Sequence, residues 1–177
     1  MTKLRDDPRN IIDYYAYWKE DAIKADLRSK CNNFSVLVQN LIHDFNLGSI
    51  VRNANAFCAK EVIIYGHKKY DKRGTVGAHI YTTMKHVRFV EELDLSDSIV
   101  VGVDNLEQAV PIESFVWPDK HVVLVFGQEG TGLTEEMVEL LDHMVYISQY
   151  GSVRSLNVGC ASAIAMYDYC RKMVHPM

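Results

Sequence analysis

The sequence has few of the features that mark membrane, secreted or metal-binding proteins. Its 177 residues include only 4 prolines and 4 cysteines, and no apolar run approaches the roughly 18 residues of a membrane span. The cysteines form no CxxC pair and have no histidine at zinc-finger spacing, so we expect reduced, mostly buried thiols and no metal site. The first residues lack an apolar export segment, which predicts a cytoplasmic location.

The chain also lacks an excess of basic residues. It has 19 Lys and Arg against 23 Asp and Glu, a formal net charge of −4, which argues against a uniformly basic surface that coats nucleic acid. A local basic patch stays possible. With 48% hydrophobic, 24% charged and 10% aromatic residues, the composition predicts a single folded domain.

The pattern of apolar residues changes at residue 34. Before it, apolar positions at a helical period predict one amphipathic helix over residues 10–30. After it, short β-branched runs alternate with helical segments. We expect strands at 34–38, 61–65, 86–90, 98–103, 121–126 and 144–147, and helices from Asn46 to Phe57, over 134–141 and over 157–172. Continuous apolar strands are buried on both faces, so this order predicts an α/β fold with a mainly parallel sheet flanked by helices.

A first candidate segment, Asn46–Ala54, lies where a helix is expected to follow a strand. Asn46 is a suitable N-cap, and Gly48 lets another backbone or a ligand approach the free N–H groups of the helix, which favour anions. On its own, the segment predicts no more than a capped helix with a solvated Arg52.

A second segment, Val122–Leu133, places three glycines in six residues between a buried strand and a helix. Ligands of open α/β sheets bind beyond the carboxyl ends of the strands, where glycine-rich turns let the backbone approach a nucleoside. The spacing is neither GxGxxG nor a P-loop, which disfavours a dinucleotide site or an NTPase. A tight turn is the plain structural interpretation, but packing does not explain a carboxylate at Glu129.

A third segment, Ile147–Ile164, combines two capping residues with a helix start made of small residues. Ser155 and Asn157 are suitable N-caps. The small side chains allow another backbone to come close, and they occupy Gly159, Ala161, Ser162 and Ala163.

Together, in this order and at these separations, the three segments resemble the three motifs of the SpoU (TrmH-type) branch of the SPOUT methyltransferases. The resemblance covers roughly residues 34–172. Members transfer a methyl group from S-adenosylmethionine to a ribose 2′-oxygen in tRNA or rRNA. The resemblance implies that residues 34–177 form a methyltransferase domain after a helical extension, residues 1–33. It also implies that the C-terminal segment threads a deep trefoil knot, a rare exception among folds.

The resemblance further assigns roles to individual residues. It places the cofactor against Gly127, Ile147 and Leu156, largely through backbone groups. The catalytic residues that it implies are Asn46, Arg52, Glu129, Ser155 and Asn157. A guanidinium stays protonated, so our hypothesis is that Arg52 binds a neighbouring RNA phosphate or the developing alkoxide, while Ser155 and Asn157 orient ribose and arginine. Methyl transfer of this kind needs no metal.

RNA contact requires local positive charge. Besides Arg52, the short segment Lys68–Arg73 carries four cations, Lys68, Lys69, Lys72 and Arg73, against one carboxylate. A cationic loop is more often simply solvated, but beside an RNA-modifying site we favour phosphate binding.

Members of the family are usually homodimers with the active site near the interface. This implies that the small-residue face of the last helix, together with Ile11–Trp18, is candidate interface surface. Ser148 stands where many members have proline, which bears on the pocket wall. Two alternatives stay open: a non-catalytic RNA-binding protein of the same fold, and an unrelated α/β nucleotide-binding enzyme that uses Glu129 as a base.

Overall fold

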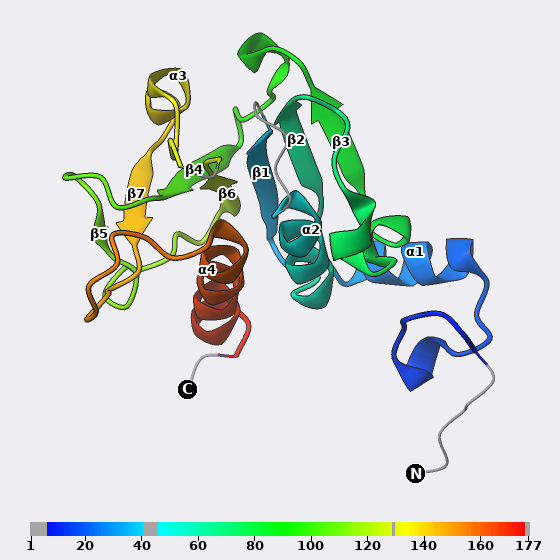
Figure 1. Cartoon of the computed structure of the whole chain (residues 1–177). Helices are drawn as coiled ribbons and strands as arrows, with labels where there is room; N and C mark the ends of the chain where they lie inside the picture. Colours follow the sequence, from blue (N-terminus) through cyan, green and yellow to red (C-terminus); the bar gives the residue numbers. More distant parts are fainter. Residues whose placement is uncertain (1–6, 41–45, 129, 176–177) are drawn as a thin grey trace.

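The computed structural model describes residues 7–40, 46–128 and 130–175, and over these it has an α/β architecture (Figure 1). Within the described residues, seven parallel strands form one sheet in the order β3-β2-β1-β6-β4-β7-β5. The strands are β1 (Phe34–Asn40), β2 (Val62–Gly66), β3 (Met84–Val87), β4 (Ser98–Val103), β5 (Val110–Pro111), β6 (His121–Phe126) and β7 (His143–Tyr146). The helices are α1 (Glu20–Ser29), α2 (Leu47–Ala56), α3 (Glu135–Val138) and α4 (Val158–Met173). The predicted fold class is confirmed, and the knot stays a prediction.

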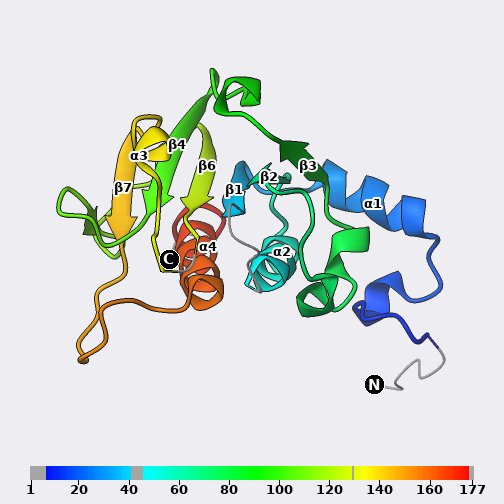
Figure 2. The ribbon, with the colours of Figure 1, turned by 45° about the horizontal axis from the view of Figure 1, so that its top comes forward.

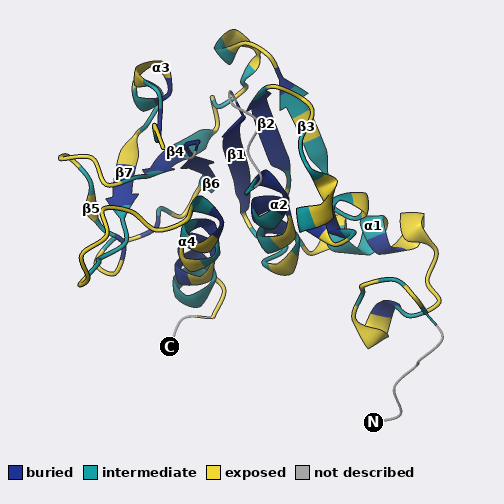
Figure 3. Ribbon diagram, viewed as in Figure 1, coloured by how far each residue is buried: buried dark blue, intermediate teal, exposed yellow. Residues whose placement is uncertain are grey.

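The middle of the sheet is buried on both faces (Figure 3). All seven positions of β1 are buried, as a strand covered on both sides requires. Its side chains alternate between two apolar clusters. Val36 and Val38 pack in one cluster with residues of α2 and α4, and Leu37 packs in the other with Met137 of α3. The apolar run that begins at Phe34 therefore contributes side chains to both apolar clusters.

Helices α2 and α4 lie side by side on one face of the sheet (Figures 1 and 2). Asn53 of α2 donates its side-chain N–H groups to the carbonyl oxygen of Gly159, at 2.8 Å, and to Ser162 Oγ, at 2.9 Å. A Cβ on Gly159 would lie only 3.1 Å from Ser49 Cβ. The small residues at the start of α4 therefore allow close helix packing, as predicted.

Several element boundaries differ from the predicted ones. The helix expected over residues 10–30 is divided into a 3₁₀ turn, Asp13–Tyr15, and α1. Tyr17 lies between them with φ of 66°, a left-handed conformation that a continuous helix cannot contain. The strand expected over residues 86–90 lies at 84–87, and the helix expected over 134–141 ends at Val138. Strand β5 was not predicted, because two residues are too few to show a period.

The cysteines were only partly predicted. All four are free, but Cys160 is exposed on α4 and the other three are half-buried, so the expectation of mostly buried thiols was wrong. Among the helices of the described residues, none has the length and apolar character to cross a membrane.

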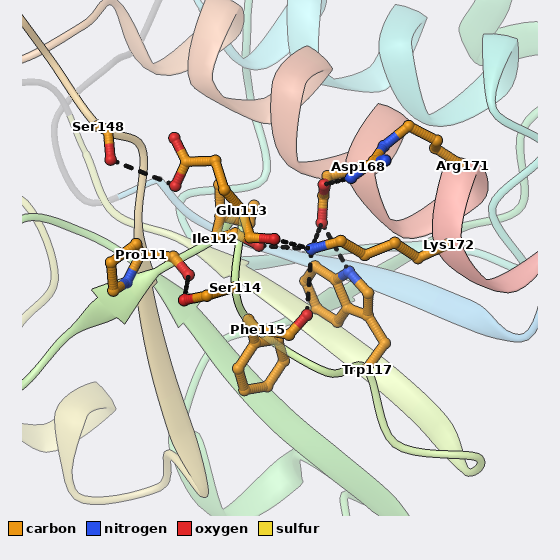
Figure 4. A network of polar contacts seen from close by, with 10 residues as sticks. All are labelled: Pro111, Ile112, Glu113, Ser114, Phe115, Trp117, Ser148, Asp168, Arg171 and Lys172. Carbon is orange, nitrogen blue, oxygen red and sulfur yellow. Dashed lines mark hydrogen bonds and ion pairs between the residues drawn. The ribbon is translucent and has the colours of Figure 1, made fainter. Parts of the chain in front are cut away.

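A polar network fastens the end of α4 to the loop after β5 (Figure 4). Lys172 Nζ donates to the backbone carbonyl oxygens of Ile112 (2.6 Å), Glu113 (3.0 Å) and Phe115 (3.1 Å). The same ammonium pairs with Asp168 Oδ2 at 2.8 Å, and the Trp117 indole N–H donates to that oxygen at 2.9 Å. Since Asp168 and Trp117 are both buried, this network satisfies polar groups that have little contact with water.

Replacing Lys172 by methionine should lower the free energy of unfolding by about 2–4 kcal/mol, because it leaves the buried carboxylate and three carbonyl groups with fewer partners. Urea denaturation measures this. The matched control is Lys85→Met, which breaks the pair with Glu61 of a lysine whose side chain is 61% exposed. It should cost at most about 1 kcal/mol. Equal losses in the two variants would contradict this role for Lys172.

Candidate functional site

A pocket of about 250 Å³ opens at the carboxyl ends of β4, β6 and β7. This is the edge of a parallel sheet at which ligands of open α/β folds bind. Four of the cofactor and catalytic residues implied by the resemblance line it: Gly127, Ile147, Ser155 and Leu156. The remaining lining residues are Val103, Asp104, Asn105, Leu106, Gln128, Gly130, Thr131, Gly132, Tyr146, Gln149, Val158 and Ala161. The structure thus brings two of the three sequence segments into one cavity.

The first wall of the pocket is the glycine-rich turn after β6. Gln128 and Gly132 exchange two backbone hydrogen bonds, of 3.2 and 3.1 Å, which close the turn. A Cβ on Gly127 would lie 2.3 Å from the carbonyl carbon of Gly132, so no side chain fits there. Gly132 has φ of 69°, a left-handed conformation that glycine adopts without strain. The glycines are therefore required by the turn itself, as well as by any ligand that it contacts.

Two residues that join the pocket walls were not predicted from the sequence. Asp104, directly after β4, accepts the backbone N–H of Leu133 at 3.0 Å and so holds the glycine-rich turn. Its neighbour Asn105 donates its side-chain N–H to the carbonyl oxygen of Arg154 at 2.8 Å and so holds the loop before α4. The sequence did contain a signal for these two residues. A carboxylate and an amide directly follow the apolar run 98–103, at the edge of the sheet where ligands bind.

Two side-chain oxygens of the pocket residues lack a partner. Gln128 Oε1 and Gln149 Oε1 are buried and accept no hydrogen bond from any described residue. Buried polar atoms in folded proteins are normally paired, so unpaired ones mark a site where a ligand can complete the hydrogen bonding.

Asn46 and Asn157 meet between the two helices, at the rim of this region. Asn157 caps α4 by accepting the backbone N–H of Cys160 at 3.3 Å, and its side-chain N–H donates to Asn46 Oδ1 at 3.0 Å. Asn46 occupies the N-cap position of α2, as predicted, but its side chain makes no capping bond to the described helix. Ser155 does not cap α4 either, since the cap position is occupied by Asn157 and the helix begins at Val158. The expected first and third segments are nevertheless in direct contact.

Arg52 lies in the second half of α2 and is exposed. Its side chain makes no hydrogen bond or ion pair with any described residue, so its guanidinium is available to an external anion. Arg52 does not line the pocket. Glu129 lies outside the described residues.

The predicted cationic segment is docked against the start of α2. Gly48 lies so close to it that a Cβ there would be 2.9 Å from both Gly74 Cα and the carbonyl oxygen of Asp71. From β1, buried Asn40 donates to the carbonyl oxygen of Lys69 at 3.1 Å. These contacts hold the segment beside the helix that carries Arg52.

The cations of this segment differ in their availability. Lys68, Lys69 and Lys72 form no ion pair with described residues. Arg73 instead pairs with Asp71 at 2.6 Å, and this guanidinium lowers the pKa of the Asp71 carboxyl to about 2. Three of the four predicted cations are therefore without an ionic partner among the described residues. In the described part of the chain, no group of three or more His, Cys, Asp or Glu side chains is arranged to hold a metal ion.

Comparison with known proteins gives one family and relatives within it. The family model described as the SpoU rRNA Methylase family matches residues 33–167. The 23S rRNA (guanosine-2′-O-)-methyltransferase RlmB of Acinetobacter baylyi is 29% identical over 137 residues, 72% of this chain and 55% of that protein. The chain therefore spans little more than half the length of this relative.

Two solved structures are similar at 25% sequence identity and a TM-score of 0.74 each. One is the SpoU methyltransferase AviRb from Streptomyces viridochromogenes in complex with the cofactor AdoMet, with 86% of this chain and 62% of that chain covered. The other is the A. aeolicus TrmH/SpoU tRNA modifying enzyme, with 86% and 81% covered.

Proposed function

Because the chain belongs to the SpoU rRNA methylase family, we propose that it transfers a methyl group from S-adenosylmethionine to a ribose 2′-hydroxyl of tRNA or rRNA. The observation that carries the proposal is that the predicted cofactor residues Gly127, Ile147 and Leu156 line one pocket. Residues 34–177 act as the methyltransferase domain and residues 1–33 as an extension. We place the reaction in the cytoplasm.

The pocket fits S-adenosylmethionine in its chemistry. The glycine-rich turn offers backbone groups without side chains in the way, and the unpaired oxygens of Gln128 and Gln149 supply acceptors for a ligand that carries N–H groups. When bound, the cofactor supplies a methyl group on a positively charged sulfur. Gly127, Ile147 and Leu156 hold its adenosine part, largely through the backbone.

The catalytic roles follow from the contacts around the two helix starts. Arg52 binds an RNA phosphate or the developing alkoxide, because a guanidinium stays protonated and cannot serve as a base. Asn157, which holds Asn46, fixes the junction of α2 and α4 and with Ser155 orients the ribose. We include Glu129 among the catalytic residues because of its place in the second motif. This alignment of hydroxyl and methyl group is the main contribution of the protein to the rate.

Methyl transfer to the ribose is tested with labelled S-adenosylmethionine and unmodified tRNA and rRNA transcripts. A 2′-O-methyl group blocks alkaline cleavage at the next phosphodiester, so label should appear in alkali-resistant dinucleotides. Arg52→Lys should lower kcat/KM roughly a hundredfold, since it keeps the charge but loses the planar fork. Arg28→Lys, which makes the same exchange on α1, is the control.

Near-normal methylation by Arg52→Lys would contradict a bidentate role for Arg52. Label in mononucleotides would place the methyl group on a base instead of the ribose. RNA binding without any transfer would favour the alternative of a non-catalytic RNA-binding protein.

RNA binding is assigned to Arg52 and the cationic segment, Lys68, Lys69, Lys72 and Arg73. The double variant Lys69→Ala/Lys72→Ala should weaken RNA binding at low salt. It should also make the slope of log K against log salt shallower, by about 0.7–0.9 for each phosphate that the two lysines neutralise. The control is Lys19→Ala/Lys120→Ala, which removes two exposed lysines from other surfaces. Equal slopes in the two double variants would rule out this segment as the phosphate-binding surface.

A homodimer with the active site near the interface is supported by the outer face of α4. Cys160, Ile164 and Tyr167 lie on one exposed stripe of this helix, spaced four and three residues apart. Apolar stripes on the surface often mark interfaces. The stripe begins four residues after Leu156 of the pocket.

The dimer is tested by sedimentation velocity on the wild type and two matched variants. Ile164 and Ile80 are each 39% exposed, so Ile164→Asp and Ile80→Asp introduce the same charge at equal exposure. Ile164→Asp should give the mass of a monomer, and Ile80→Asp should leave the dimer intact. A monomeric wild type, or a dimer that survives Ile164→Asp, would overturn the assignment of this face.

A further inference from the structure

Asp104 is the one charged side chain among the described residues that line the pocket. Its carboxylate forms no ion pair with a described lysine, arginine or histidine. Its negative charge is therefore not neutralised by a neighbouring cation, in a cavity whose other described walls are neutral.

The position of this carboxylate is determined by the backbone around it. Asp104 Oδ1 accepts the N–H of Asn105 at 2.7 Å, and Oδ2 accepts the N–H of Leu133 at 3.0 Å. A Cβ on Gly132 would lie 2.5 Å from Oδ2, so only the missing side chain of that glycine allows the carboxylate to come so close. The Asp104 carboxylate and the glycine-rich turn therefore hold each other in place. The carboxylate cannot rotate away from the pocket wall without breaking both hydrogen bonds.

The proposed reaction changes the charge of the molecule in the pocket. When the methyl group leaves, the electron pair of the carbon–sulfur bond returns to sulfur. The sulfonium becomes a neutral thioether, and the hydroxyl proton is released to an acceptor. The cofactor product, S-adenosylhomocysteine, therefore carries one positive charge less than S-adenosylmethionine.

We propose that Asp104 makes the pocket prefer the cationic cofactor to its neutral product, and so favours product release. This inference rests on the function proposed above. For two unit charges about 10 Å apart, at an effective dielectric constant of about 20, the attraction changes an equilibrium roughly tenfold, and it changes the equilibrium more at shorter distances. The two molecules share their ammonium and carboxylate groups and differ in the positive charge on sulfur, so a fixed negative charge near that sulfur supplies this selectivity.

Asp104 also fastens the glycine-rich turn, and the two roles predict different results. If a variant only loosened the glycine-rich turn, it would lower the affinity for every ligand of the pocket to a similar degree. If a variant removed the charge, it would lower the affinity for the cationic ligands and leave the affinity for the neutral one unchanged. The ratio of affinities separates the roles, whereas the activity does not.

The test is calorimetric titration of the full chain with three ligands: S-adenosylmethionine, sinefungin and S-adenosylhomocysteine. Sinefungin carries an amine in place of the methylated sulfur and so retains a positive charge. The wild type should bind both cationic ligands roughly tenfold more tightly than S-adenosylhomocysteine at low salt. Asp104→Asn should reduce this preference to about one. Asp104→Glu, which retains the charge, should keep it.

The matched control is Glu107→Gln, which removes the same charge from an exposed loop residue outside the pocket lining. It should leave all three affinities unchanged. Equal affinities of the wild type for the three ligands would overturn the inference without any variant, as would a preference that survives Asp104→Asn. A wild type that binds none of the three would overturn the proposed function, and the inference with it.

Discussion

The parallel direction of every strand in the described sheet determines where this protein can work. Parallel strands all end at the same edge, so the segments that leave β4, β6 and β7 must begin next to one another. Those segments carry Asp104, the glycine-rich turn from Gly127, and the loop that starts at Ile147. The pocket is therefore a consequence of strand direction, and its chemistry is supplied by three loops that are far apart in the sequence.

A second junction places the proposed substrate side beside this pocket. Asn157 at the start of α4 holds Asn46 at the start of α2, and Asn53 holds Gly159. Close packing is possible only because Ser49 faces a glycine. Since α2 also carries Arg52 and supports the cationic segment, this helix pair connects the pocket proposed for the cofactor with the surface proposed for RNA. The net charge of −4 is compatible with this arrangement, because the lysines of that segment are gathered locally.

The sequence predicted the features that depend on local pattern. Apolar runs predicted β1, β4 and β6, and the capping role of Asn157 was predicted from its side chain. The motif resemblance implied that Gly127, Ile147 and Leu156 contact the cofactor. The three residues line one pocket, and their contacts with the cofactor stay predictions.

The features that depend on distant contacts could not be predicted in this way. The three carbonyl oxygens that Lys172 binds lie about sixty residues earlier in the chain, and no pattern in the sequence of α4 predicts these contacts. Tyr17 breaks the N-terminal helix although tyrosine has no general tendency to adopt a positive φ. Asp104 was overlooked because it belongs to no motif, yet it joins two walls of the pocket.

The central claim is that S-adenosylmethionine binds at the ends of β4, β6 and β7. Hydrogen exchange measured by mass spectrometry, with and without the cofactor, locates its site directly. Binding should slow exchange in residues 127–133 and 147–157, and leave the strands β2 and β3 unchanged. Protection elsewhere, such as in the pocket lined by Ser35, Lys60 and His121 at the opposite edge of the sheet, would contradict the account.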